Sequence, residues 1–344
     1  MSVPLNRPSR SKWRDVAHSP NPAKANITAV ATFMATALGL AGLVAFSITN
    51  RHAAWRGKAQ QAEERSSSSS AKLRVRAEVA RELNSGAAVL ALAVLADSGL
   101  EHYRALFFNR AMYTPLVVST MTLGVSLHGM SDRRKSPHRL RDAIYALAAL
   151  TGLGGTAFHF YNVGKRPGGY AFQNLFYGAP IGAPFALLLA GLLGVAAERV
   201  RDAGRGEQPQ LAHIPEGRAL AAVTAAGLLG TVGEVALFHF RGAYQDPFMF
   251  LPVTLPPLAA ALMARAAVEG GGSPRPLTRL MLRITTALGV AGVGFHAYGI
   301  ARNMGGWRNW SQNVLNGPPL PAPPSFTGLA LAGLGALRLL EHAP

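Results

Sequence analysis

The chain has 344 residues, of which 49% are hydrophobic and only 15% are charged, and its 34 lysines and arginines outnumber its 17 acidic residues. Soluble domains contain about 25% charged residues, so this composition, with charges clustered between long apolar stretches, is typical of a multi-pass membrane protein. The lack of cysteine excludes disulfides, thiolate metal sites and covalently attached haem. The net charge of +17 indicates basic membrane-flanking loops and not a nucleic-acid-binding surface.

The predicted elements begin with a polar tail over residues 1–26 and a first membrane helix over 27–48. A charged cytoplasmic segment follows over 49–83, as a helix interrupted by the serine run Ser66–Ser70. A helix needs about 20 mostly apolar residues to cross a bilayer, and eight more such stretches bring the expected spans to nine. These eight are Asn84–Tyr103, Tyr113–Met130, Arg141–Tyr161, Pro180–Glu198, Arg218–Phe240, Phe250–Ala267, Thr278–Ile300 and Ser325–Leu340.

The basic residues are distributed unevenly among the expected loops. Most of them lie in the segments 49–83, 131–142, 199–218 and 265–283, whereas the alternate loops contain few. The positive-inside rule places the basic segments in the cytoplasm, with the N-terminus outside and the C-terminus inside. Because Ala-, Gly- and Arg-rich composition is typical of a bacterium with GC-rich DNA, the expected location is the bacterial inner membrane.

Four histidines near the expected outer ends of the helices have a regular spacing. His102 and His239 are 137 positions apart, and so are His159 and His296. The residues around them match in the same pairing, with a two-residue insertion after the second pair, and an acidic residue precedes each member of the first pair by five positions. The other matched residues used below are Arg104 and Arg241, Asp97 and Glu234, and Lys165 and Arg302.

These matches predict an internal duplication. The first half covers residues 84–217 and the second half covers residues 218–344, and each contains four helices arranged as two hairpins. Both halves have the same topology because an even number of spans separates them. The expected fold is therefore an all-α membrane protein with one N-terminal span and two four-helix halves related by a pseudo-two-fold axis along the membrane normal.

The four histidines are the main candidate site. Each lies about 27–30 Å along its helix, which places all four in one layer near the outer edge of the hydrocarbon. A polar side chain there is costly unless it faces the bundle interior, and neutral imidazole is a good ligand for metals and haem. Lone histidines on separate helices favour b-type haem in the bundle core. The alternatives are a copper site, or histidines that only cap helices or bond between them.

The sequence leaves two pairings of the histidines open. One or two haems are held either within each half, by His102 with His159 and His239 with His296, or across the halves, by His102 with His239 and His159 with His296. Basic residues follow the histidines in the outer loops, where they are candidates for binding haem propionates or other anions, or are ordinary loop charges. These basic residues are Arg104, Arg241, Lys165 and Arg302.

Two acidic residues, Asp97 and Glu234, lie inside expected membrane spans and are candidates for proton transfer to a quinone or for support of a histidine. A five-residue offset is about 500° of helical rotation, so neither acid shares a face with the histidine that follows it. Any such contact is expected to be with a neighbouring helix. His128 and His138 have no matched partners and are predicted to lie at helix ends or in loops.

These features together predict a membrane subunit that passes electrons between an extracytoplasmic oxidoreductase partner and quinone. The alternatives are a transporter with parallel repeats, and a non-catalytic anchor or assembly subunit. Two parallel four-helix bundles with two histidines each, over residues 84–344, resemble haem A synthase in architecture alone. No motif of that family is present, so the resemblance implies no site residue and no activity here.

Overall fold

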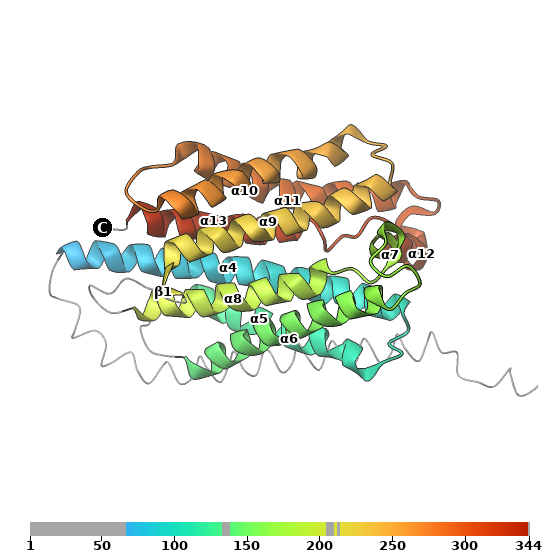
Figure 1. Cartoon of the computed structure of the whole chain (residues 1–344), viewed down its shortest axis with the longest axis horizontal. Helices are drawn as coiled ribbons and strands as arrows, with labels where there is room; N and C mark the ends of the chain where they lie inside the picture. Colours follow the sequence, from blue (N-terminus) through green and yellow to red (C-terminus); the bar gives the residue numbers. More distant parts are fainter. Residues whose placement is uncertain (1–66, 133–137, 204–209, 212–213, 343–344) are drawn as a thin grey trace, which may run out of the picture.

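The computed structural model describes residues 67–132, 138–203, 210–211 and 214–342, and these residues are almost entirely helical (Figure 1). Its long helices are α4 (Ser67–Arg104), α5 (Thr114–Ser131), α6 (Arg139–Gly164), α8 (Gly182–Asp202), α9 (Glu216–Arg241), α10 (Leu251–Glu269), α11 (Pro276–Arg302) and α13 (Pro324–Glu341). The short elements are η2 (Arg110–Tyr113), α7 (Phe172–Tyr177), η3 (Pro247–Phe250), η4 (Gly306–Asn309), α12 (Trp310–Asn316) and the antiparallel pair β1 (Gln210–Leu211) and β2 (Ile214–Pro215).

Six of the long helices are long and apolar enough to cross a membrane. These six are α4, α6, α8, α9, α10 and α11. Helices α5 and α13, with 18 residues each, are not among them. The expected polar tail at 1–26, the first span at 27–48 and residues 49–66 lie outside the described residues. The chain is thus an all-helical protein with multi-pass character, and the count of nine spans stays a prediction.

Helix α4 differs from the expectation for its N-terminal part. The sequence predicts a charged segment up to residue 83 and a separate span from Asn84, but α4 runs without a break from Ser67 to Arg104. Its first turn lies in the serine run, which therefore begins this helix. Val79, Leu83 and Ala87 are fully buried on α4, so its apolar stripe continues across the expected boundary.

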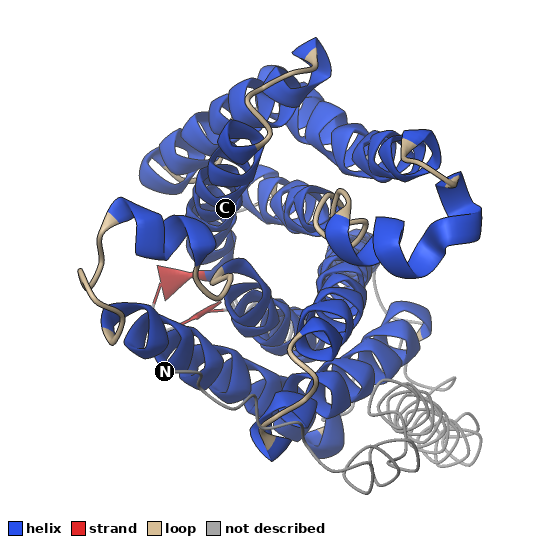
Figure 2. Cartoon of the chain, turned by 90° about the vertical axis from the view of Figure 1, so that its right-hand side faces the viewer, coloured by secondary structure: helices blue, strands red, loops and turns tan. Residues whose placement is uncertain are grey.

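Six of the long helices share one large core, and α5 and α6 contribute to smaller apolar clusters beside it. Buried residues of α4, α8, α9, α10, α11 and α13 belong to the largest apolar cluster, in which Leu90, Leu193, Leu228 and Met263 are almost completely shielded. Viewed from the end where α7 and α12 lie, the long helices run roughly along the line of sight (Figure 2). This arrangement gives the molecule two ends, one of which contains the C-terminal ends of α4, α6, α9 and α11.

Helices α4 and α13 approach each other through glycine. A methyl group added to Gly86 would lie 2.6 Å from the Gly328 carbonyl oxygen, and one added to Gly328 would lie 2.9 Å from the Gly86 carbonyl oxygen. Small residues allow such close backbone packing between membrane helices. Gly99, on the same helix, has no atom within 4 Å of the corresponding position.

We therefore expect Gly86→Ala to destabilise the protein by about 1–3 kcal/mol, because a Cβ there overpacks the α4–α13 contact. Gly99→Ala is the matched control and should change stability by no more than about 1 kcal/mol, the difference in helix propensity. Thermal unfolding in detergent measures both. Equal midpoints for the two variants would show that the α4–α13 contact is not tight.

Candidate functional site

The four candidate histidines lie toward the C-terminal ends of four different helices. His102 and His239 are in the last turns of α4 and α9, and His159 and His296 lie near the ends of α6 and α11. These helix ends are at the end of the molecule that carries α7 and α12 (Figure 1). All four side chains are partly buried.

Each histidine ring lies against a main-chain carbonyl through its Nδ1 atom. The Nδ1 of His102 is 2.6 Å from the Met112 oxygen, and the Nδ1 of His239 is 2.7 Å from the Met249 oxygen. A carbonyl oxygen only accepts hydrogen bonds, so Nδ1 must carry the proton. In the neutral ring, Nε2 then keeps its lone pair.

The other two histidines follow the same rule with a proline carbonyl as acceptor. The Nδ1 of His159 is 2.5 Å from the Pro180 oxygen, and the Nδ1 of His296 is 2.7 Å from the Pro319 oxygen. An Nδ1–H held by a carbonyl is the support that protein-bound metals usually require of a ligating histidine, because it fixes the tautomer and the ring orientation.

The turn after α4 positions the Met112 carbonyl. Leu106 and Phe107 adopt positive φ angles of 58° and 46°, a conformation that costs a non-glycine residue about 1–2 kcal/mol. Phe107 stacks on Tyr113 with centroids 4.5 Å apart and planes at 14°. The Asn109 side chain accepts a hydrogen bond from the backbone two residues further on at 2.9 Å. Stacking and capping together hold this strained turn below the ring of the histidine.

The turn after α9 has the same construction. Ala243 and Tyr244 have φ angles of 54° and 45°, and Tyr244 stacks on Phe250 at 4.6 Å and 17°. The Asp246 carboxylate accepts a hydrogen bond from the backbone two residues further on, also at 2.9 Å. The turns after α4 and α9 differ in sequence but have the same strained backbone conformation. In both turns, a main-chain carbonyl lies against the histidine ring.

The histidines are also close enough in pairs to influence each other. His159 lies near His102, and His239 lies near His296. Both interactions join histidines of the same half.

The predicted loop position is wrong for Arg104, Arg241 and Arg302, which are the last residues of α4, α9 and α11, whereas Lys165 directly follows α6. All four basic residues have partners of their own. The Arg241 guanidinium lies 5.3 Å from the centre of the Tyr177 ring, and Lys165 and Arg302 lie over the rings of Tyr161 and Tyr298, at 5.1 Å and 5.5 Å. The fourth, Arg104, forms an exposed ion pair of 2.7 Å with the Glu101 carboxylate, which is worth little in stability. Their predicted contact with haem propionates stays a prediction.

The two intramembrane acids lie on α4 and α9. The Glu234 Oε1 accepts a hydrogen bond of 2.9 Å from the Gly182 N–H at the start of α8, so its contact is with a neighbouring helix, as its offset from His239 predicts. A methyl group on Gly182 would lie 1.6 Å from the Glu234 carboxylate, which explains the glycine. Asp97 is near enough for the charge of Glu234 to act on it.

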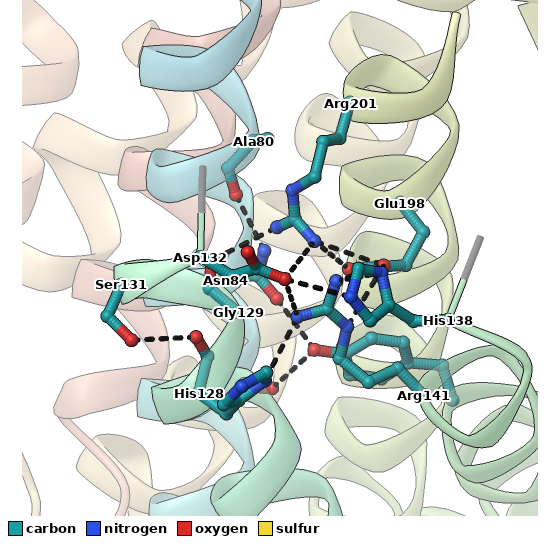
Figure 3. Close-up of polar contacts among 12 residues, drawn as sticks. Ala80, Asn84, His128, Gly129, Ser131, Asp132, His138, Arg141, Glu198 and Arg201 are labelled. Carbon is teal, nitrogen blue, oxygen red and sulfur yellow. Dashed lines mark hydrogen bonds and ion pairs between the residues drawn. The ribbon is translucent and has the colours of Figure 1, made fainter. Parts of the chain in front are cut away.

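A second polar cluster, which the sequence did not predict, lies at the opposite end of the first half (Figure 3). Arg141 is completely buried, and its Nε and Nη2 atoms donate to the Glu198 carboxylate at 3.0 Å and 2.6 Å. Its Nη1 donates to Asp132 at 3.1 Å, and Arg201 donates to Glu198 at 2.9 Å. Two guanidinium groups thus meet two carboxylates almost without solvent.

Both unmatched histidines belong to this cluster. The His138 Nε2 is 2.9 Å from Asp132, and its Nδ1 is 2.6 Å from an Arg141 nitrogen, while the His128 Nδ1 is 3.1 Å from another. The prediction of helix-end or loop positions is correct for both residues, since His138 directly precedes α6 and His128 is in the last turn of α5. The prediction missed that these ends converge.

A neutral layer of the same cluster lies one turn further along α6. The Tyr145 hydroxyl is 2.6 Å from the Asn84 Oδ1 and 3.2 Å from the Ser126 Oγ, and all three residues are completely buried. The charged and neutral layers together join α4, α5, α6 and α8 at this end. No sequence signal indicates that these four helices meet, because each polar residue by itself fits a helix end.

The fold and these contacts define the class of the protein, a helical chain whose described residues include six helices suited to crossing a membrane. Comparison with known protein families, with curated proteins and with solved structures finds no match to this chain. The architectural resemblance to haem A synthase therefore stays an expectation from the sequence.

Proposed function

We propose that the protein is a membrane subunit that binds b-type haem through His102, His159, His239 and His296 and carries electrons. The observation that supports this most is the state of the four rings, each of which gives its Nδ1–H to a main-chain carbonyl. Each Nε2 is left as a neutral, oriented lone pair, which is the atom that a haem iron needs.

The donor set suits haem better than a bare metal ion. A porphyrin supplies four nitrogens, so two imidazoles complete the coordination of the iron. Among the described residues, there is no group of three or more histidine, aspartate or glutamate side chains that could hold a metal ion by itself. Bound haem would supply one-electron chemistry, and the four histidines would hold it with rings oriented by their carbonyl partners.

The pairing within each half has the better support. His102 lies near His159 and His239 lies near His296, so each half would hold its own haem. We also propose that the two halves arose by duplication and are related by the pseudo-two-fold axis along the membrane normal. The repeated turns support this, because positive φ angles, ring stacking and capping recur at the same spacing as the histidines.

The proposed orientation follows from charge. With the basic segments in the cytoplasm of a bacterial inner membrane, the histidine layer lies near the periplasmic surface. Electrons would arrive there from an extracytoplasmic oxidoreductase partner and leave to quinone. Asp97 and Glu234 lie between the two halves and are the residues we assign to proton exchange with that quinone.

A reduced-minus-oxidised absorption spectrum of the purified protein, together with iron and copper analysis, tests the proposal. Two haems per chain and a bis-imidazole spectrum are expected. A purified chain without haem absorbance would reject haem, and copper in place of iron would point to the copper alternative.

The transporter alternative has one observation in its favour, the proximity of Asp97 and Glu234 between α4 and α9. Acidic residues facing a bundle interior often mark ion pathways. Proton flux into proteoliposomes that is lost in Asp97→Asn combined with Glu234→Gln, and a chain without haem, would favour this function over electron transfer.

A further inference from the structure

The first turns of α11 form a groove together with the end of α13, at the opposite end of α11 from His296. Its volume is about 420 Å³, and Arg275, Arg279, Leu280, Arg283 and Glu341 are among the residues that line it. Ligand sites in proteins have volumes of about 300–1,000 Å³, so the groove is large enough for a small polar group such as a lipid headgroup.

The groove contains more arginines than acidic residues that could form ion pairs with them. Arg279 and Arg283 are four residues apart, which places them on one face of α11, and Arg275 directly precedes the helix. Arg279 forms an ion pair with Glu341, and Arg275 lies 3.6 Å from Glu269. Arg283 is exposed and forms no hydrogen bond or ion pair with any residue that the structure describes.

The position of Arg283 suggests the kind of group that would pair with it. It lies on a helix apolar enough to cross a membrane, about 10 Å from the start of that helix at 1.5 Å per residue. Leu280 in the groove is 51% exposed, and Leu277 one turn before it is 57% exposed. A charged group that is flanked by exposed leucines at this depth faces lipid headgroups and the upper part of the acyl chains.

We propose that this groove binds the headgroup phosphate of an anionic phospholipid, with Arg279 and Arg283 on the phosphate and an acyl chain along Leu280. Arginine suits a phosphate because its fork of N–H donors matches two oxygens at once, and basic pockets between membrane helices are known to hold such headgroups. Binding would break the ion pair between Arg279 and Glu341. Two hydrogen bonds from the Arg279 guanidinium to the phosphate would offset this loss.

The first half provides an internal comparison, which rests on the proposed duplication. The positions that match Arg275, Arg279 and Arg283 are His138, Asp142 and Ala146. None of these is arginine, and one is acidic, so the fold of a half does not require the arginine row. The proposal therefore predicts one lipid site per chain and not two.

Native mass spectrometry of the purified full chain in detergent, titrated with dioleoyl phosphatidylglycerol, tests the proposal. One tightly bound lipid per chain is expected. The double variant Arg279→Gln with Arg283→Gln should weaken this binding about 25-fold, since each basic residue near an anionic lipid accounts for about five-fold. Arg283→Gln alone should weaken it about five-fold and leaves every ion pair of the described structure in place.

The matched control combines Arg81→Gln with Arg139→Gln, which removes two exposed arginines from the same end of the molecule. This control should keep wild-type affinity, and dioleoyl phosphatidylcholine should bind neither protein tightly. Equal weakening in the control, or equal affinity for phosphatidylcholine, would overturn the proposal. So would saturation of the site by inorganic phosphate alone at millimolar concentration. The result does not depend on haem content, so its failure would leave the proposed function intact.

Discussion

Alanine at His102 is expected to remove one of the two haems and to leave the other. With pairing inside each half, the reduced-minus-oxidised absorbance of His102→Ala falls to about half of the wild-type value, since an iron with one imidazole removed loses its hold in the site. His239→Ala should give the same loss from the other half.

The double variants separate the two pairings. His102→Ala with His159→Ala should lose no more haem than His102→Ala alone, because both ligands belong to one iron. His102→Ala with His239→Ala should lose both haems. If the pairs cross between the halves, the two outcomes are exchanged. Haem content by pyridine haemochromogen assay, together with the spectrum, measures each variant.

His342→Ala is the control for these variants. This histidine is exposed at the end of α13, where its Nδ1 lies 2.8 Å from the Arg338 carbonyl oxygen. It therefore has the same Nδ1 contact as the four candidates but no partner histidine in the layer. Full haem content in His342→Ala, with half content in His102→Ala, would assign the loss to the site and not to a general effect of removing a histidine.

The repeated spacing of the four histidines predicts that they lie in one layer. Four isolated histidines carry little information, but the shared spacing placed His102 with His239 and His159 with His296, and the structure places all four at one end of the bundle. The sequence could not predict their carbonyl partners. Leu106 and Phe107, which bend the chain beneath His102, are residues that rarely adopt positive φ, and such strain leaves no mark in a sequence.

The glycine turns show the opposite case. Gly168 and Gly169 have φ angles of 89° and 56°, and Gly305 and Gly306 have 81° and 51°. Here the residue type, glycine, indicates the left-handed backbone conformation, and the matched Gly-Gly pairs were visible in the sequence. The predicted boundary at residue 83 was wrong because charged residues predict exposure to water but do not end a helix. Only the buried stripe of α4 decides how far it continues.

Only part of the polar cluster has a charged counterpart under the proposed duplication, in which Asp132 and His138 correspond to the ion pair of Glu269 and Arg275. With the spacing of the proposed duplication, Arg141, Glu198 and Arg201 correspond to Thr278, Leu337 and Leu340, and the second-half residues are all buried. In the neutral layer, Tyr145, Asn84 and Ser126 correspond in the same way to the buried residues Leu282, Ala221 and Met263. At these positions, the proposed second half therefore packs uncharged side chains where the proposed first half packs charged and polar ones.

We therefore expect Arg141→Thr to destabilise the protein by about 3–5 kcal/mol, because it leaves the Glu198 carboxylate buried without its main partner. The triple variant Arg141→Thr, Glu198→Leu, Arg201→Leu should lose less, about 1–3 kcal/mol, because the Glu198 carboxylate is removed together with both arginines and Asp132 keeps His138 as its partner. Unfolding by a denaturing detergent in mixed micelles measures both free energies.

Arg265→Thr is the control for this pair, because its ion pair with Glu269 is exposed and should contribute less than about 1 kcal/mol. A triple variant less stable than Arg141→Thr would show that the charges themselves hold α5, α6 and α8 together. A triple variant that recovers stability would separate the cluster from folding. The retention of these three charged residues in one half alone would then reflect a role in what that half does.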